Sequence, residues 1–172
     1  YSYVEEIDRK NSQLVFSKDK NHISFDYDNL VIATGTEPRL MPTDNSDMEG
    51  VHYLRSISDV EKIKSSLKDS KNMVIIGGGY IGLEVAAVSK TLGLNVTVIE
   101  MASRILERVT SPIISSFYNS FHESKGVNIL TSTSVKGING DKKVSSVETS
   151  LGTIDADIVI VGIGVLPWQS LA

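Results

Sequence analysis

The spacing of apolar residues divides the chain into a short first part and a longer second part. Residues 1–35 carry short apolar runs separated by polar turns, a pattern that predicts the strands of a small antiparallel sheet. The runs lie around Val4–Ile7, Leu14–Phe16, Ile23–Tyr27 and Leu30–Thr34. Residues 36–50 hold Pro38, Pro42 and Gly50 but few periodic apolar positions, which predicts a linker to the main domain.

In the second part, helical and strand-like spacings of apolar residues alternate. Helices are predicted from Ser58 with Val60, Ile63 and Leu67 on one face, from the glycine turn to Gly93, and from Thr110 or Ser111 to about Lys125. Strands are predicted at Met73–Ile76, Asn95–Glu100, Asn128–Leu130 and Ile158–Val161, with a β-meander within residues 134–153. This order predicts an α/β fold, with a parallel sheet covered on both faces and joined by right-handed crossovers.

Glycines stand between the first predicted strand of this sheet and the helix after it. Gly77, Gly79 and Gly82 have the spacing G-x-G-x-x-G, and the full turn reads Gly77, Gly78, Gly79, Tyr80, Ile81, Gly82. In that position the motif favours a Rossmann-type dinucleotide site, because the glycines allow a tight turn and the helix start supplies N–H donors to a pyrophosphate. The alternative is a purely structural glycine turn in another α/β protein.

Glu100 ends the next predicted strand, 100 − 77 = 23 positions after the first glycine of the motif. An acid at about this distance accepts hydrogen bonds from the adenosine ribose, and its charge repels a 2′-phosphate, so it favours NAD(H) over NADP(H). It could instead be a solvated residue at the end of a strand. Arg104 could either attract a 2′-phosphate or lie against the adenine face.

Composition narrows the chemistry. Lys and Arg number 17 against 21 Asp and Glu, and no long basic run is present, so nucleic acid is not an expected partner. The chain has no cysteine, so redox chemistry within it must use a bound cofactor. The three histidines, His22, His52 and His122, lack the spacing of metal ligands and are expected at the surface, and no metal is expected. Without a leader-like start or a membrane-length apolar run, we expect a cytoplasmic location and no membrane contact.

Two further segments suggest a family. LVIATGTEPR at residues 30–39 and IVIVGIGVLP at residues 158–167 bracket GGGYIGLE, as in the pyridine nucleotide-disulfide oxidoreductases. With VIE, RILERVTSP and SFYNSFHESKGVNI, the chain most resembles the putidaredoxin reductase-like group, which passes electrons to ferredoxin or rubredoxin. Trp168 departs from that pattern, in which Asn usually follows the preceding proline.

The resemblance implies an NADH domain inserted into an FAD domain. It implies that residues 1–40 end the first flavin segment, that 41–165 bind NAD(H), and that 166–172 begin the returning flavin segment. It places Thr34, Gly35 and Arg39 beside FAD, and Gly162, Ile163 and Gly164 beside the nicotinamide ring.

The resemblance also implies that Tyr80 shields the flavin until nicotinamide displaces it, and that Glu84 lies near the carboxamide. Simpler interpretations stay open: Tyr80 as a lid on the coenzyme groove, Glu84 as a first-turn acid favoured by the helix dipole, and the glycines as a turn.

In such an enzyme, NADH reduces FAD, which reduces an iron–sulfur protein. The chain lacks an initiator Met and a second glycine fingerprint for FAD, so we expect it to be part of a longer enzyme and inactive alone. Two alternatives stay open: a flavin disulfide reductase with its cysteines elsewhere, and an apoptosis-inducing-factor-like redox or interaction protein. Low-molecular-weight thioredoxin reductases are disfavoured because they carry their cysteine pair within this domain.

Overall fold

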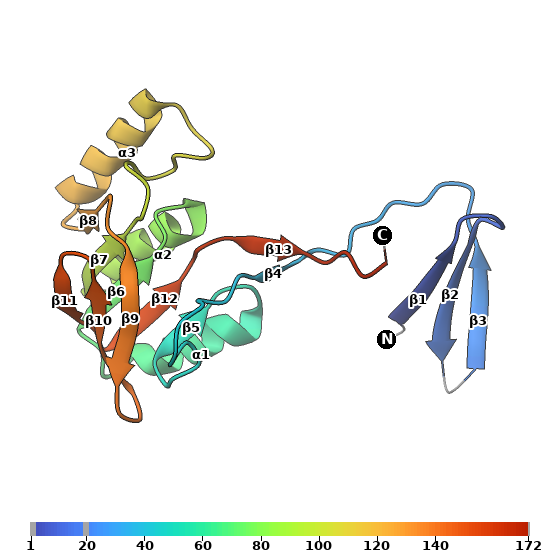
Figure 1. Ribbon diagram of the computed structural model, residues 1–172, viewed down its shortest axis with the longest axis horizontal. Coiled ribbons are helices and arrows are strands. Elements are labelled where there is room, and N and C mark those ends of the chain that lie inside the picture. Colours follow the sequence, from blue (N-terminus) through green and yellow to red (C-terminus); the bar gives the residue numbers. More distant parts are fainter. Residues whose placement is uncertain (1–2, 19–20, 172) are drawn as a thin grey trace. The chain divides into compact units, whose positions relative to one another are not determined.

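The computed structural model describes residues 3–18 and 21–171 and divides the chain into two units (Figure 1). One unit contains the residues up to Glu37 together with those from Val165 onward, and the other is Pro38–Gly164. The assignment of these units to flavin and coenzyme stays a prediction.

The first unit contains the predicted antiparallel sheet. Its strands are β1 (Tyr3–Asp8), β2 (Gln13–Lys18) and β3 (Asn21–Asp26), in the order β1-β2-β3. The turn after β1 is closed by the Asp8 carboxylate, whose Oδ1 accepts the backbone N–H of Lys10 at 2.9 Å and of Asn11 at 3.0 Å. A short polar side chain that bonds its own backbone is typical of such turns.

The prediction of a fourth strand at Leu30–Thr34 is wrong. These residues join no sheet in the described part of the chain, and Val31 is 84% exposed. A strand needs a neighbour for its backbone groups, and local sequence does not reveal whether one exists. The strand lies slightly later: β4 (Thr36–Pro38) forms a two-stranded sheet with β13 (Val165–Pro167).

The second unit is built on a five-stranded parallel sheet (Figure 1). The strands are β5 (Val51–Tyr53), β12 (Ile158–Val161), β6 (Asn72–Ile76), β7 (Asn95–Ile99) and β8 (Asn128–Leu130), in that spatial order. From β6 the chain moves outward to β7 and β8, and then returns to β12 on the other side of β6. The order therefore reverses between β6 and β12, where ligands of open α/β sheets bind.

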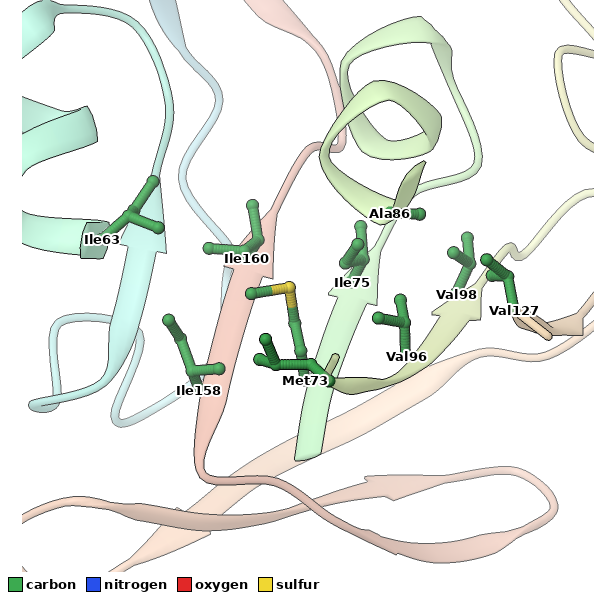
Figure 2. Packing of buried hydrophobic residues seen from close by; sticks show 10 residues of the cluster. Ile63, Met73, Ile75, Ala86, Val96, Val98, Val127, Ile158 and Ile160 are labelled. Carbon is green, nitrogen blue, oxygen red and sulfur yellow. The ribbon is translucent and has the colours of Figure 1, made fainter. Parts of the chain in front are cut away.

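Both faces of this sheet are buried, because alternate side chains of each central strand enter different cores. Met73 and Ile75 of β6 join one apolar cluster with Ala86, and Val74 and Ile76 join the other. Figure 2 shows the first cluster, which contains side chains of β12, β6 and β7, with Ala86 lying next to Ile75. The continuous apolar runs in the sequence are explained by this double burial.

Helices cover one face of the sheet. They are α1 (Ile57–Leu67), α2 (Tyr80–Thr91) and α3 (Pro112–Ser124). The predicted start of α1 at Ser58 is wrong by two residues, because Ser56 and Asp59 cap each other's backbone and fix the first turn earlier. None of the helices in the described part of the chain has the length and apolarity needed to span a membrane.

The other face packs on the predicted β-meander. Its strands are β9 (Val135–Gly140), β10 (Val144–Thr149) and β11 (Gly152–Asp155), in the order β11-β10-β9. Ile138, Val144 and Val147 are buried against Val159 and Val161 of β12. The α/β class, the parallel sheet, its flanking helices and the meander are thus confirmed.

Candidate dinucleotide-binding site

The glycine turn between β6 and α2 is closed by backbone atoms. Gly77 has φ of +111°, and its N–H donates to the carbonyl of Ile99 at 2.8 Å. A Cβ on Gly77 would overlap the carbonyl oxygen of Gly162, and a Cβ on Gly82 would overlap that of Gly77. The first and third glycines are therefore required by the packing of the turn itself.

Gly79 is different, because a Cβ there would meet no atom within 4 Å. It is the N-cap residue of α2, and neither a side-chain capping bond nor an acidic residue in the first turn accompanies it. The first N–H groups of a helix have no partner within it, and together with the helix dipole they favour an anion. The fold leaves open backbone at the second glycine, where the motif predicts a pyrophosphate.

Tyr80 and Ile81 open α2 and are 55% and 42% exposed. Glu84 is also exposed, but it is the fifth residue of the helix. The interpretation of Glu84 as a first-turn acid is therefore wrong. Its predicted place near the carboxamide stays a prediction.

Glu100 directly follows β7 and is turned toward the glycine turn. Its Oε2 accepts the N–H of Gly78 at 2.7 Å, and its Oε1 accepts the N–H of Ala102 at 2.8 Å. Each carboxylate oxygen has two lone pairs, so these bonds leave acceptor capacity for further donors such as ribose hydroxyls. The carboxylate is half-buried and held by backbone, which fixes its direction.

Arg104 lies on the segment between β7 and α3. Its Nη1 donates to the carbonyl of Thr110 at 3.0 Å and to Ser115 Oγ at 2.6 Å, and its Nη2 donates to the carbonyl of Glu107 at 2.9 Å. These bonds use three of the five N–H donors of the guanidinium. The predicted contact of Arg104 with the coenzyme stays a prediction.

Gly162, Ile163 and Gly164 follow β12 at the same edge of the sheet as the glycine turn and Glu100, because the carboxyl ends of parallel strands meet there. Gly162 donates its N–H to the carbonyl of Ile76 at 2.7 Å, and Ile163 packs on the core beneath the meander. Gly164 has φ of +115°, which favours glycine. The structure thus brings three predicted parts of the site to one edge.

Thr34 and Gly35 lie in the first unit, where they bond to the segment after β13. Thr34 Oγ1 donates to the carbonyl of Trp168 at 2.7 Å, and Trp168 N–H donates to the carbonyl of Gly35 at 3.0 Å. Arg39 lies in the second unit, and its N–H donates to the carbonyl of Gly164 at 3.0 Å. Their contacts with a flavin stay predictions.

A protein-family model for pyridine nucleotide-disulphide oxidoreductases matches residues 1–172. The chain belongs to this family.

Among its relatives, rhodocoxin reductase of Rhodococcus erythropolis is 42% identical over 87% of this chain and 35% of its own length. Putidaredoxin reductase of Pseudomonas putida is 41% identical over 98% of this chain and 41% of its own length. A solved ferredoxin reductase of Rhodopseudomonas palustris matches with a TM-score of 0.85 and 34% identity, over 97% of this chain and 41% of that one. The chain therefore spans about two fifths of the length of these oxidoreductases.

The sequence predicted that all three histidines lie at the surface, and this prediction is wrong for two of them. His122 on α3 is only 7% exposed, and His52 is half-buried with its Nε2 2.9 Å from Ser66 Oγ. Burial lowers the pKa of both imidazoles. No three His, Asp or Glu side chains of the described residues gather as a metal site.

The sequence did not predict the residues of the 104–115 region that pack against the glycine turn. Leu106 donates its N–H to the carbonyl of Gly78 at 2.9 Å, and Ser115 is buried beneath the segment that carries Leu106. Leu106 has φ of +55°. A leucine in the sequence gives no indication of a positive φ, because this conformation is uncommon outside glycine. Only the helix start at Pro112, close to Ser115, was visible in the sequence.

Proposed function

We propose that this chain binds NADH and orients it for hydride transfer to FAD, in a longer reductase that passes electrons to a ferredoxin or rubredoxin. The proposal is carried by the open backbone at Gly79, which lies at the uncapped start of α2 with the Glu100 carboxylate beside the same turn. Nothing in the packing explains Gly79, whereas a pyrophosphate held by the helix start does.

The residues of the turn fit a dinucleotide by their chemistry. Backbone N–H groups at the start of α2 would hold the pyrophosphate, and Glu100 would accept hydrogen bonds from the adenosine ribose. The bound cofactors would supply the redox chemistry, with hydride leaving NADH and entering FAD, while the protein supplies orientation. FAD is further supported by a solved Desulfovibrio vulgaris family member described as FAD-dependent, 30% identical with a TM-score of 0.74.

On the nicotinamide side, the proposal gives Tyr80 the role of a shield and Glu84 a place near the carboxamide. Gly162, Ile163 and Gly164 would pass beside the ring, and Thr34, Gly35 and Arg39 would lie beside the flavin. The exposure of Tyr80 and Glu84 on α2 supports contact with a ligand.

An iron–sulfur acceptor is supported by relatives. Putidaredoxin reductase has been solved in a covalent complex with putidaredoxin, and it matches with a TM-score of 0.83 at 40% identity. Rubredoxin-NAD(+) reductase of Pseudomonas putida is 38% identical over 89% of this chain and 40% of its own length.

The test is coenzyme titration by calorimetry at one fixed salt concentration, because salt screens the charge of a 2′-phosphate. We expect the chain to bind NADH well above NADPH. Glu100→Ala should weaken NADH binding about tenfold to a hundredfold, since hydrogen bonds to a charged acceptor are lost. It should strengthen NADPH binding, since repulsion of the 2′-phosphate is removed.

Glu100 also holds the N–H of Gly78, so a second variant must separate charge from turn geometry. Glu100→Gln keeps an acceptor oxygen but removes the charge, and it should narrow the gap between NADH and NADPH. Glu123→Gln removes the same charge from an exposed position on α3 and should change neither affinity. A wild-type preference for NADPH, or no binding of NADH, would sink the proposal.

Sulfur reduction is a second candidate. An NAD-dependent persulfide reductase of A. fulgidus matches with a TM-score of 0.85 and 35% identity, over 99% of this chain and 32% of that one. The present chain has no cysteine, so a thiol centre for this reaction would have to lie outside it. NADH-dependent assays of the full-length protein with ferredoxin, rubredoxin, disulfide, persulfide and oxygen distinguish the two candidates.

A further inference from the structure

The peptide groups of Gly78 are held from two directions. Its N–H donates to Glu100 Oε2 at 2.7 Å, and its carbonyl accepts the N–H of Leu106 at 2.9 Å. Ile105 packs so closely that its Cγ2 would lie 2.8 Å from a Cβ on Gly78. Ile105 and Leu106 are 0% and 3% exposed, so the 104–110 segment forms the back wall of the glycine turn.

This wall has an unfavourable local conformation. Leu106 has φ of +55°, a region that L side chains avoid and that persists only where the surroundings hold it. In this backbone conformation, the N–H of Leu106 donates to the carbonyl of Gly78. Something outside Leu106 must therefore keep the segment closed.

Arg104 makes hydrogen bonds across this segment. Its guanidinium bridges the carbonyls of Glu107 and Thr110, on the far side of Leu106, and donates to Ser115 Oγ at 2.6 Å. Ser115 is 1% exposed and donates its own hydroxyl hydrogen to the carbonyl of Ile105 at 2.7 Å. The planar fork of arginine can hold several carbonyls at fixed angles, which the single ammonium of lysine does not.

We propose that Arg104 is a positioning residue: it closes the 104–110 segment so that Leu106 fixes Gly78, and it does not select the coenzyme by its charge. The inference rests on the proposed NADH site for its binding readout. It differs from the role that the sequence suggested, in which Arg104 touches the adenine or a 2′-phosphate.

The experiment compares Arg104→Ala, Arg104→Lys and Lys142→Ala in the full 172-residue chain. Lys142 is exposed in the turn between β9 and β10 of the same unit, so Lys142→Ala controls for the loss of a positive charge outside the 104–110 segment. Calorimetry gives the affinities for NADH and NADPH, and amide hydrogen exchange reports on Gly78 and Leu106. Val147 in β10 is the reference for global unfolding.

Both Arg104 variants should weaken the binding of NADH and of NADPH by the same factor, about tenfold, because both coenzymes are proposed to bind the same glycine turn, which the substitutions loosen. The ratio of the two affinities should stay at the wild-type value, and exchange should rise at Gly78 and Leu106 but not at Val147. Lys142→Ala should bind both coenzymes as the wild type does. Ser115→Ala removes the hydrogen bond between Arg104 and Ser115, and it should change the coenzyme affinities and the amide exchange in the same direction but less. It replaces Arg104→Ala in the experiment if that variant fails to fold.

Three results would overturn the positioning role. The first is a loss of NADPH binding without a loss of NADH binding in the Arg104 variants. The second is wild-type affinity of Arg104→Lys for both coenzymes. The third is unchanged amide hydrogen exchange at Gly78 and Leu106 in the Arg104 variants. If the wild-type chain bound no NADH, the proposed function would fail, yet selective exchange at Gly78 would still support the closure by Arg104.

Discussion

At the scale of single residues, glycine is present at the three positions of the motif for different physical reasons. Gly77 and Gly82 leave no room for a side chain because carbonyl oxygens occupy the place of a Cβ. Gly79 has that room, so the fold itself does not demand glycine there. One motif therefore combines two positions that packing restricts to glycine with one position at which packing leaves room for a side chain.

Alanine at these positions should separate stability from binding. Gly82→Ala should lower the free energy of unfolding by about 1–3 kcal/mol or more, because the new methyl group forces backbone atoms apart. Gly79→Ala should cost less stability, about 1 kcal/mol or below, because alanine is a poorer N-cap than glycine. It should weaken NADH binding about tenfold, because the methyl group occupies the space proposed for pyrophosphate. Urea unfolding and calorimetry on both variants test this. Equal losses of stability would contradict the distinction.

Glu84 is exposed on α2 and lies beyond its first turn. If it lies near the nicotinamide carboxamide, Glu84→Gln in the full-length enzyme should slow hydride transfer about tenfold and weaken NADH binding less. Stopped-flow reduction of the flavin measures the rate, and its concentration dependence gives the affinity. An unchanged rate with reduced affinity would assign Glu84 to binding alone.

At the scale of elements, α3 should make stability depend on pH through His122. Burial lowers the pKa of this imidazole below its ordinary value of 6.5, so the folded state favours the neutral ring. The stabilisation is complete above pH 6.5, where the unfolded chain is also neutral. It is lost as pH falls from 6.5 through the folded pKa, because the unfolded state then binds the proton more readily.

Urea unfolding at pH 8 and pH 5 measures this effect. The wild type should lose stability between these values, and His122→Leu should lose less. His22→Gln provides the control, since His22 is exposed and its Nδ1 lies 3.3 Å from the Glu5 carboxylate. If His122→Leu kept the full pH dependence, carboxylates or other histidines would be responsible.

The elements also indicate what local sequence can predict. The strands β6, β7 and β12 were predictable because both faces are buried and their apolar runs are continuous. β5 was missed because three residues are too few for a periodic pattern, and its place depends on pairing with β12. The Leu30–Thr34 run was mistaken for a strand because the apolar pattern says nothing about a partner.

In the candidate site, the sequence predicts the residues whose spacing is fixed, but not the hydrogen bonds that depend on the conformation of the backbone. The glycine motif and Glu100 could be located because their spacing follows from strand and helix lengths. The bonds from Leu106 to Gly78 and from Arg104 to Ser115 could not, because they depend on a positive φ and on a buried hydroxyl.

At the scale of the whole molecule, the two units differ in whether they contain the sequence and structural features of a dinucleotide site. The motif G-x-G-x-x-G occurs once in the sequence, and it lies in the second unit. The first unit is built from β1, β2, β3 and the pair of β4 with β13, and no helix of the described residues belongs to it. A helix start that could hold the pyrophosphate of FAD is therefore not found in the described part of that unit.

The chain should consequently purify without bound flavin, and it should bind NADH but not oxidise it. Contacts from Thr34, Gly35 and Arg39 alone would be too few to retain FAD, because the FAD pyrophosphate needs backbone donors of its own. The absorbance spectrum of the purified chain, and assays of NADH oxidation with oxygen or ferredoxin, measure both points. NADH titration of the same sample is the control, since it shows that the second unit is folded. A yellow preparation that oxidises NADH would mean that the first unit holds FAD without a helix start.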